Sequence, residues 1–173
     1  MLLHHRSLKT GQMGPVIDIH SHKKILGYIE QSEKEGAQII LDGRSWISKM
    51  KDHEEMGGGC WIGPTVIIHN NKTDKAMNEE VFGPVLSVYN VSTWHEAIAI
   101  ENSNPFGNAA AIYTSNGGHA EWFLKRVRAS VSILPNGNRL CPLLSNFILA
   151  DDFQSKHPHW LLRACIGLSR SCQ

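Results

Sequence analysis

Residues 85–134 have the sequence VLSVYNVSTWHEAIAIENSNPFGNAAAIYTSNGGHAEWFLKRVRASVSIL, in which two kinds of local pattern alternate. Three short runs rich in β-branched and apolar residues, at 85–91, 109–114 and 130–134, are typical of strands. The two segments between them carry helix signals, so the order is strand, helix, strand, helix, strand. This order is typical of right-handed crossovers and a parallel sheet. We therefore expect an α/β fold.

Both expected helices have recognisable ends. Residues 93–96, TWHE, form a capping box, in which the Thr93 hydroxyl and the Glu96 carboxylate each accept a backbone N–H. Pro105 ends this helix, because the residue before a proline is biased away from helical geometry. Residues 116–118, NGG, open the second helix. Its apolar residues recur at helical spacing: Ala120, Phe123, Leu124 and Val127.

For the residues before position 85 we predict one further helix and two further strands. A short apolar stripe predicts a helix between residues 21 and 36, and Gly36 is a natural stop signal. Residues 37–41 then predict a short buried strand, closed by the turn residues at 42–43. The β-branched run at 65–68 predicts another strand.

The character of the chain changes after residue 134. Residues 135–173 hold three of the four cysteines and show no sustained apolar period, so we divide the chain into a domain at 6–134 and a divergent tail at 135–173. Within this tail, the apolar pairs Leu161-Leu162 and Cys165-Ile166 predict one or two helical turns.

Charge and composition exclude several classes of function. The chain has 173 residues, 17 Lys and Arg against 16 Asp and Glu, and a formal net charge of +1. This balance lacks the basic footprint of a nucleic-acid-binding protein. No run of about 20 apolar residues is long enough to span a membrane. The first ten residues lack the apolar stretch of a secretory signal, so we expect an intracellular protein with reduced cysteines.

The segment best suited to bind a ligand is EEVFGPV, residues 79–85. It places an acidic pair and an aromatic ring before a tight turn and a strand, at the edge of a sheet, where α/β proteins often bind ligands. The Glu80 carboxylate can accept two hydrogen bonds from a vicinal diol such as a ribose, and the Phe82 ring can pack on a flat heterocycle. Alternatively, Glu80 is a solvated turn residue and Phe82 a core anchor.

Other candidates for catalysis or metal binding are weaker. Cys60 follows three glycines, but no base or positive field accompanies it in the sequence. The pairs His20/His22 and His157/His159 each offer two imidazoles, whereas zinc normally takes four ligands. We therefore interpret these histidines as surface residues and predict no metal site.

Residues 79–85 resemble the E-E-[IV]-F-G-P-V motif of the NAD(P)-dependent aldehyde dehydrogenase superfamily. Other segments resemble motifs of the same family, in the family's order: MGPVI at 13–17, GA at 36–37 with IILDG at 39–43, IGPTV at 62–66, NPFGN at 104–108 and AIYT at 111–114. The sequence LDGR at 41–44 and the Gly-Asn pair at 107–108 are most similar to the methylmalonate-semialdehyde dehydrogenase branch, which forms acyl-CoA. The resemblance covers residues 6–134.

This resemblance implies a mechanism for the whole enzyme. A cysteine thiolate attacks the aldehyde, hydride passes to the nicotinamide, and the thioester is released to water or to coenzyme A. NAD is the expected cofactor. The residue matching Glu80 holds the nicotinamide ribose diol, and the residue matching Phe82 contacts the nicotinamide end. No catalytic residue is carried over to this chain.

The resemblance also implies that part of the enzyme is missing. In the family, the dinucleotide-binding domain and the nucleophilic cysteine precede the motif at 13–17, and only thirteen residues precede Gly14 here. We expect a parallel-sheet, three-layer fragment that is inactive alone and acts with a full-length aldehyde dehydrogenase or self-associates. Its location would be the cytoplasm, or the mitochondrion in a eukaryote. The alternative is a non-catalytic truncated product or assembly partner.

Overall fold

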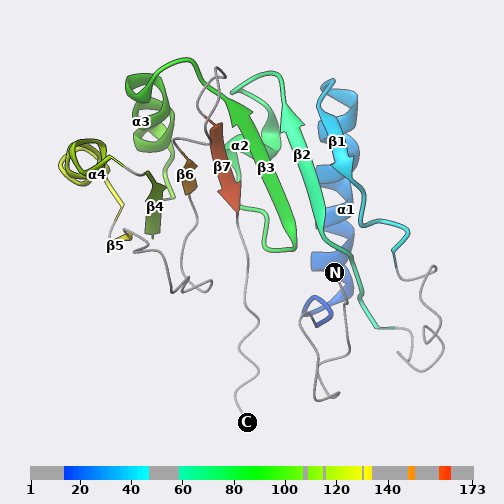
Figure 1. Cartoon of the computed structure of the whole chain (residues 1–173). Coiled ribbons are helices and arrows are strands. Elements are labelled where there is room, and N and C mark those ends of the chain that lie inside the picture. The colour runs from blue at the N-terminus through cyan, green and yellow to red at the C-terminus, as the bar shows by residue number, and fades with distance from the viewer. Residues whose placement is uncertain are drawn as a thin grey trace, which may run out of the picture.

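A seven-stranded mixed sheet runs through the residues that the computed structural model describes, 14–46, 59–106, 109–114, 116–129, 131–133, 148–150 and 160–164 (Figure 1). The strands are β1 (Gln38–Leu41), β2 (Thr65–His69), β3 (Val85–Asn90), β4 (Ala109–Tyr113), β5 (Val131–Ile133), β6 (Ile148–Ala150) and β7 (Trp160–Ala164). The helices are α1 (Ile19–Lys34), α2 (Lys75–Asn78), α3 (Trp94–Ser103) and α4 (Gly117–Leu124). The order of the strands in the sheet is β1-β2-β3-β7-β6-β4-β5.

Strand direction confirms the α/β class and corrects one detail. β2 is parallel to β3, and β4 is parallel to both β5 and β6. β7 is antiparallel to β3 and to β6, so β3, β4 and β5 share one direction, as the crossover pattern predicts. β1 is antiparallel to β2. The sheet is therefore mixed rather than wholly parallel, because its antiparallel members come from outside residues 85–134.

α1 confirms the first predicted helix and extends it by two residues at its start. The Asp18 side chain caps the helix by accepting the Ser21 N–H at 2.6 Å. Gly36 ends the turn with a φ of 86°, in the left-handed region that glycine enters at little cost. Between these ends, Ile25 and Ile29 are 2% and 0% exposed.

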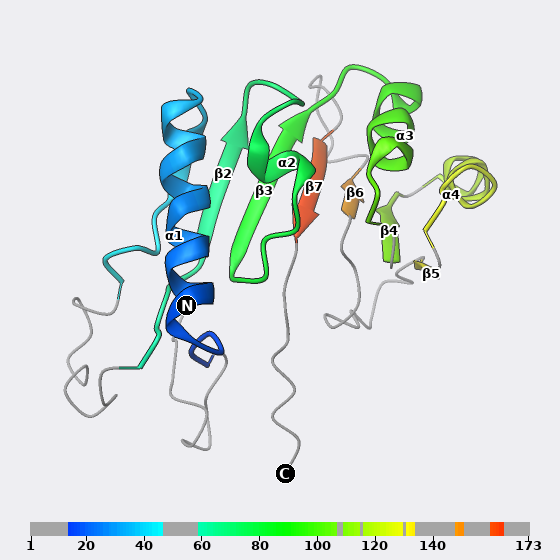
Figure 2. The same ribbon diagram turned by 180° about the vertical axis from the view of Figure 1, so that it is seen from behind.

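α1 and α2 cover one face of the sheet over β2 and β3 (Figure 2). They share a single core cluster with that face: Ile25, Tyr28, Ile29, Ala37, Ile62, Ile67, Ala76, Val81 and Val85. In this half of the sheet α1 and α2 therefore form one helical layer against the sheet. A second core cluster joins α3 and α4 to β4: Val91, Ala97, Ile98, Ala110, Ile112 and Phe123.

The ends of α3 and α4 agree closely with the sequence signals. Thr93 accepts the Glu96 N–H at 3.2 Å, as in a capping box. The Glu96 carboxylate, however, accepts the N–H of Ser92 at 3.2 Å, one residue before the expected partner. Asn116 caps α4 by accepting the N–H groups of Gly118 and His119.

Two expectations about strands and turns were wrong. β1 was predicted to be buried, yet Ile40 and Leu41 are 55% and 48% exposed because β1 forms an edge of the sheet. Leu161 and Leu162 were predicted to form a helical turn, but they lie in β7, between β3 and β6. An isolated apolar pair has no period, so its partner decides its conformation. The pair at 165–166 lies outside the described residues.

Two glycines allow the segment after β1 to lie directly against the segment before β2. The Gly63 N–H donates to the Gly43 carbonyl at 3.0 Å, and the Gly43 N–H donates to Thr65 Oγ1 at 3.1 Å. A Cβ on Gly43 would lie 2.0 Å from the Gly63 carbonyl oxygen. Because that oxygen belongs to the backbone, no side-chain rotation can relieve the clash.

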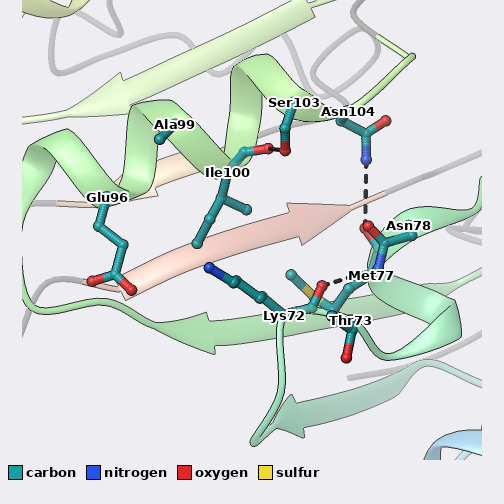
Figure 3. Close-up of a pocket in the computed structure, with 9 residues that line it drawn as sticks. All are labelled: Lys72, Thr73, Met77, Asn78, Glu96, Ala99, Ile100, Ser103 and Asn104. Carbon is teal, nitrogen blue, oxygen red and sulfur yellow. Dashed lines mark hydrogen bonds between the residues drawn. The ribbon is translucent and has the colours of Figure 1, made fainter.

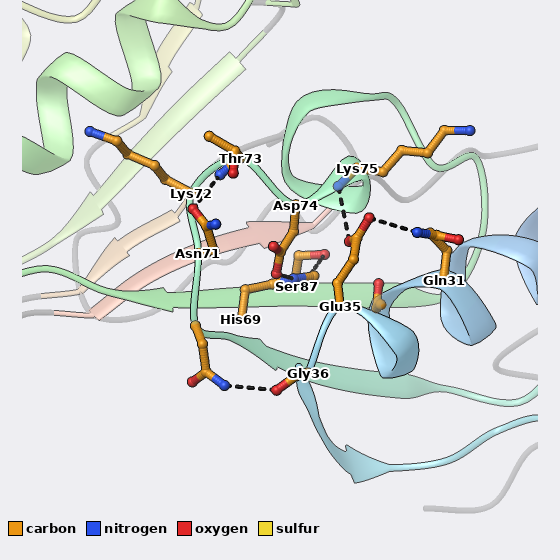
Figure 4. A network of polar contacts seen from close by, with 12 residues as sticks. Gln31, Glu35, Gly36, His69, Asn71, Lys72, Thr73, Asp74, Lys75 and Ser87 are labelled. Carbon is orange, nitrogen blue, oxygen red and sulfur yellow. Dashed lines mark hydrogen bonds and ion pairs between the residues drawn. The ribbon is translucent and has the colours of Figure 1, made fainter.

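The buried Tyr28 side chain connects α1 to the end of α2. Its hydroxyl donates a hydrogen bond to Glu79 Oε2, and its ring lies 5.6 Å from Lys75 Nζ. Burial first, and then the hydrogen bond and charge of Glu79, raise the pKa of Tyr28 to about 12. Glu35 adds a second connection, because it accepts the Lys75 N–H at 3.2 Å (Figure 4).

Gly43→Ala is expected to destabilise the protein by about 1–3 kcal/mol or more, because it forces two backbone segments apart. The matched control is Gly27→Ala within α1, where a Cβ meets nothing within 4 Å. That change should stabilise the helix by about 0.5–1 kcal/mol. Urea unfolding midpoints measure both effects, and equal midpoints for the two variants would contradict the close approach.

The phenol of Tyr28 is expected to titrate near pH 12, which absorbance of the phenolate measures as the difference from a Tyr28→Phe variant. Because the folded pKa lies above the unfolded value of about 10, this contact stabilises the fold fully below pH 10. Its contribution is lost as the pH rises towards 12. Glu79→Gln should lower the pKa of Tyr28; an unchanged titration in that variant would show that Glu79 is not its partner.

Candidate functional site

Residues 79–85 form a tightly held connection between α2 and β3. The Glu79 N–H donates to the Lys75 carbonyl at 3.0 Å and closes α2. The Gly83 N–H donates to the Val81 carbonyl at 2.9 Å, which makes a tight turn. The Thr65 N–H then donates to the Pro84 carbonyl at 2.8 Å, which ties the turn to β2. The segment therefore lies at the amino end of β3, whereas parallel sheets usually bind ligands at their carboxyl ends.

Side chains of this segment alternate between core and solvent. Val81 is 3% exposed. Gly83 is buried, and Ile25 packs so closely on it that a Cβ there would lie 2.5 Å from Ile25 Cδ1. Phe82 is 60% exposed, which excludes the interpretation of its ring as a core anchor. Glu80 is half-buried, and its carboxylate has no hydrogen bond or ion pair with any residue that the structure describes.

An unpaired carboxylate and an exposed ring two residues away are chemically useful together. The carboxylate can accept hydrogen bonds from neighbouring hydroxyl groups, and such bonds to a charged acceptor are among the stronger ones in proteins. The ring offers an apolar face that loses contact with water when a flat group covers it. The geometry of Glu80 and Phe82 is therefore compatible with a ligand that carries a diol beside a planar ring.

A separate cavity of about 330 Å³ lies between α2 and α3 (Figure 3). It is lined by Lys72, Thr73, Met77, Asn78, Glu96, Ala99, Ile100, Ser103 and Asn104. Much of its polar lining already serves the fold: Asn78 Nδ2 donates to the carbonyls of Lys72 and Asp74, and Glu96 caps α3. Glu80 and Phe82 are not among its lining residues, so this cavity is distinct from the predicted site.

A buried histidine network between β2, α2 and β3 was not anticipated. His69 Nδ1 lies 2.9 Å from Asp74 Oδ2, and His69 Nε2 lies 3.1 Å from Ser87 Oγ (Figure 4). The order of groups is that of an acyl-transfer triad. All three residues are at most 5% exposed, however, so no substrate reaches Ser87. The network holds the start of α2 against the sheet. Its one sequence signal is a histidine at the end of an apolar strand.

The weaker candidates have structural surroundings where the structure describes them. His22 Nε2 lies 2.9 Å from the Trp61 carbonyl oxygen, and His20 is exposed. Cys60 is half-buried and its thiol is free. The backbone carbonyl of Cys60 accepts the Val16 N–H. No group of three or more His, Cys, Asp or Glu that could hold a metal ion occurs within these described ranges. His157 and His159 lie outside them.

None of the helices in the described part of the chain combines the length and the hydropathy needed to cross a membrane.

Comparison with known proteins agrees with the motifs. The sequence model of the aldehyde dehydrogenase family matches residues 4–139. A probable methylmalonate-semialdehyde/malonate-semialdehyde dehydrogenase [acylating] of Anopheles gambiae is 42% identical over 115 residues, which are 66% of this chain and 21% of that protein. The chain thus spans about a fifth of the length of this curated relative.

Solved structures show the same relationship. The crystal structure of methylmalonate-semialdehyde dehydrogenase from Oceanimonas doudoroffii superposes with a TM-score of 0.66 at 34% identity, over 73% of this chain and 25% of that one. A putative methylmalonate-semialdehyde dehydrogenase from Sinorhizobium meliloti, complexed with NAD, gives 0.64 at 29% identity, over 73% and 25%. With the family match covering most of the sequence, the chain belongs to the aldehyde dehydrogenase family.

Proposed function

We propose that this chain forms part of an NAD-dependent aldehyde dehydrogenase that oxidises methylmalonate semialdehyde to an acyl-CoA. In this proposal Glu80 holds the nicotinamide ribose diol and Phe82 packs against the nicotinamide end. The observation that carries it is the half-buried Glu80 carboxylate, unpaired within the described residues, beside a ring that is 60% exposed. Both groups are available to a ligand in a turn that backbone hydrogen bonds hold in place.

The chemistry at the aldehyde needs an activated thiol. Cys60 is the one cysteine in the part of the chain that the structure describes, and the family resemblance assigns it no catalytic role. We therefore propose that a longer aldehyde dehydrogenase chain supplies the nucleophile and the rest of the cofactor site. Coenzyme A would be the acyl acceptor of the complete enzyme. The similar insect protein is named mitochondrial, and we propose the same location if the host is a eukaryote.

A second candidate function is non-catalytic. In this role the chain would be an assembly partner of a longer homologue. The two proposals differ in whether Glu80 contacts NAD.

Glu80→Gln is expected to weaken the binding of NAD by about tenfold or more, because hydrogen bonds to a charged acceptor contribute about 1.5–3 kcal/mol. A ligand-detected NMR titration of the full chain measures the affinity. The matched control is Glu121→Gln on α4, which removes an exposed carboxylate paired with Lys125 and should leave NAD binding unchanged. Equal affinity of the Glu80 variant and the unsubstituted chain for NAD would favour the non-catalytic candidate.

The unsubstituted chain mixed with NAD, methylmalonate semialdehyde and coenzyme A is expected to produce no reduced nicotinamide, as followed by its absorbance. Steady turnover by the chain alone would overturn the proposal that another chain supplies the thiol.

A further inference from the structure

β3 and β4 follow each other along the chain but are not neighbours in the sheet. Two strands from the C-terminal tail, β6 and β7, lie between them (Figure 1). Five residue pairs join β3 to β7, as many as join β3 to β2 on its other side. β6 in turn pairs with β4 and with β7, over three residue pairs each. This tail strand pair, β6 with β7, therefore makes the sheet continuous.

The tail strand pair lies outside the region shared with the family. The family match ends at residue 139, and β6 begins at Ile148. In a longer family member with equivalents of β3 and β4, other parts of the sequence are available to fill the space between them. Those other parts are extensive, because this chain covers about a quarter of the solved relatives.

Leaving that space empty would be costly. β3 and β4 would each present a row of unpaired backbone N–H and C=O groups in the middle of the sheet. Val88, near the centre of β3, is 5% exposed, so this part of the strand is buried. Buried backbone groups are almost always paired, and an unmade hydrogen bond there costs about 1–3 kcal/mol.

We propose that the tail strand pair is a built-in complement, which occupies the positions between β3 and β4 that longer family members fill from elsewhere in their chains. With it seated, this segment of an aldehyde dehydrogenase closes its own sheet within one molecule. The seated pair also blocks strand pairing of another subunit at the same two edges. Any assembly with a longer homologue then uses other surfaces or displaces the tail. This inference is independent of the role proposed for Glu80.

The register provides a sharp test. Leu86 lies opposite Ala164 in the antiparallel β3–β7 pair, and Ser87 lies opposite Arg163. Directly opposite residues have Cα atoms about 4.5–5.5 Å apart, a separation that a disulfide spans. The neighbouring residue points its side chain to the opposite face of the sheet and cannot form the same bridge.

The experiment uses the full chain with its four native cysteines replaced by serine, after circular dichroism shows that this parent unfolds cooperatively. Leu86→Cys with Ala164→Cys is expected to form an intramolecular disulfide under mild oxidation. Leu86→Cys with Arg163→Cys, the matched control, is expected to stay reduced. Mass spectrometry under non-reducing conditions detects whether each variant contains the disulfide. A disulfide in neither variant, or in both equally, would overturn the proposed register. A disulfide that links two molecules would show that a second copy fills the gap.

Hydrogen exchange of the unsubstituted chain gives a second measurement that needs no variant. In a strand, successive N–H groups point to alternate sides, so some amides of β3 face β2 and the others face β7. Comparable protection of both sets is expected. Fast exchange of the set facing β7, with the set facing β2 protected, would overturn the proposal. NAD binding is read separately through Glu80→Gln, so failure of one proposal is distinguishable from failure of the other.

Discussion

Pairing of the β3 backbone on both edges is the constraint on which the rest of the structure depends. β3 receives β2 on one side and β7 on the other, through five residue pairs each. The first contact places the two family motifs at 62–66 and 79–85 side by side, since Pro84 accepts the Thr65 N–H. The second connects the family segment to β7, which lies beyond the end of the family match at residue 139. Without both pairings of β3, the turn that carries Glu80 and Phe82 would not be anchored to a fixed strand.

The candidate site is held mainly by contacts that lie outside its own segment. Tyr28, on α1, binds Glu79, while Ile25 fills the space beside Gly83. These contacts anchor Glu79 and Gly83, while Phe82 is 60% exposed and Glu80 is half-buried. The buried network of His69 with Asp74 and Ser87 fixes the start of α2 in the same way. Rigidity before and after a short segment is what allows its other side chains to be presented to a ligand.

The proposed function depends on the family relationship and on the share of a relative that this chain spans. Membership in the aldehyde dehydrogenase family is supported by most of the sequence, yet the chain spans about a fifth of the curated relative from Anopheles gambiae. Its described residues include the half-buried Glu80 carboxylate, the exposed Phe82 ring and one cysteine, Cys60. The tail strand pair offers a physical account of how such a segment completes its sheet.

Local signals in the sequence were enough for the elements of residues 85–134 and for the helix that Gly36 follows. Caps, proline and β-branched runs act over a few residues, so a sequence displays them directly: Thr93 and Asn116 start the helices they were expected to start. The sequence also pointed to Glu80 and Phe82, although it left open whether the ring is buried. The exposed edge at Ile40, the contact between Tyr28 and Glu79 and the strand at Leu161 were decided only by tertiary structure. Each depends on a partner tens of residues away, and short apolar runs adopt the conformation and burial that such a partner provides.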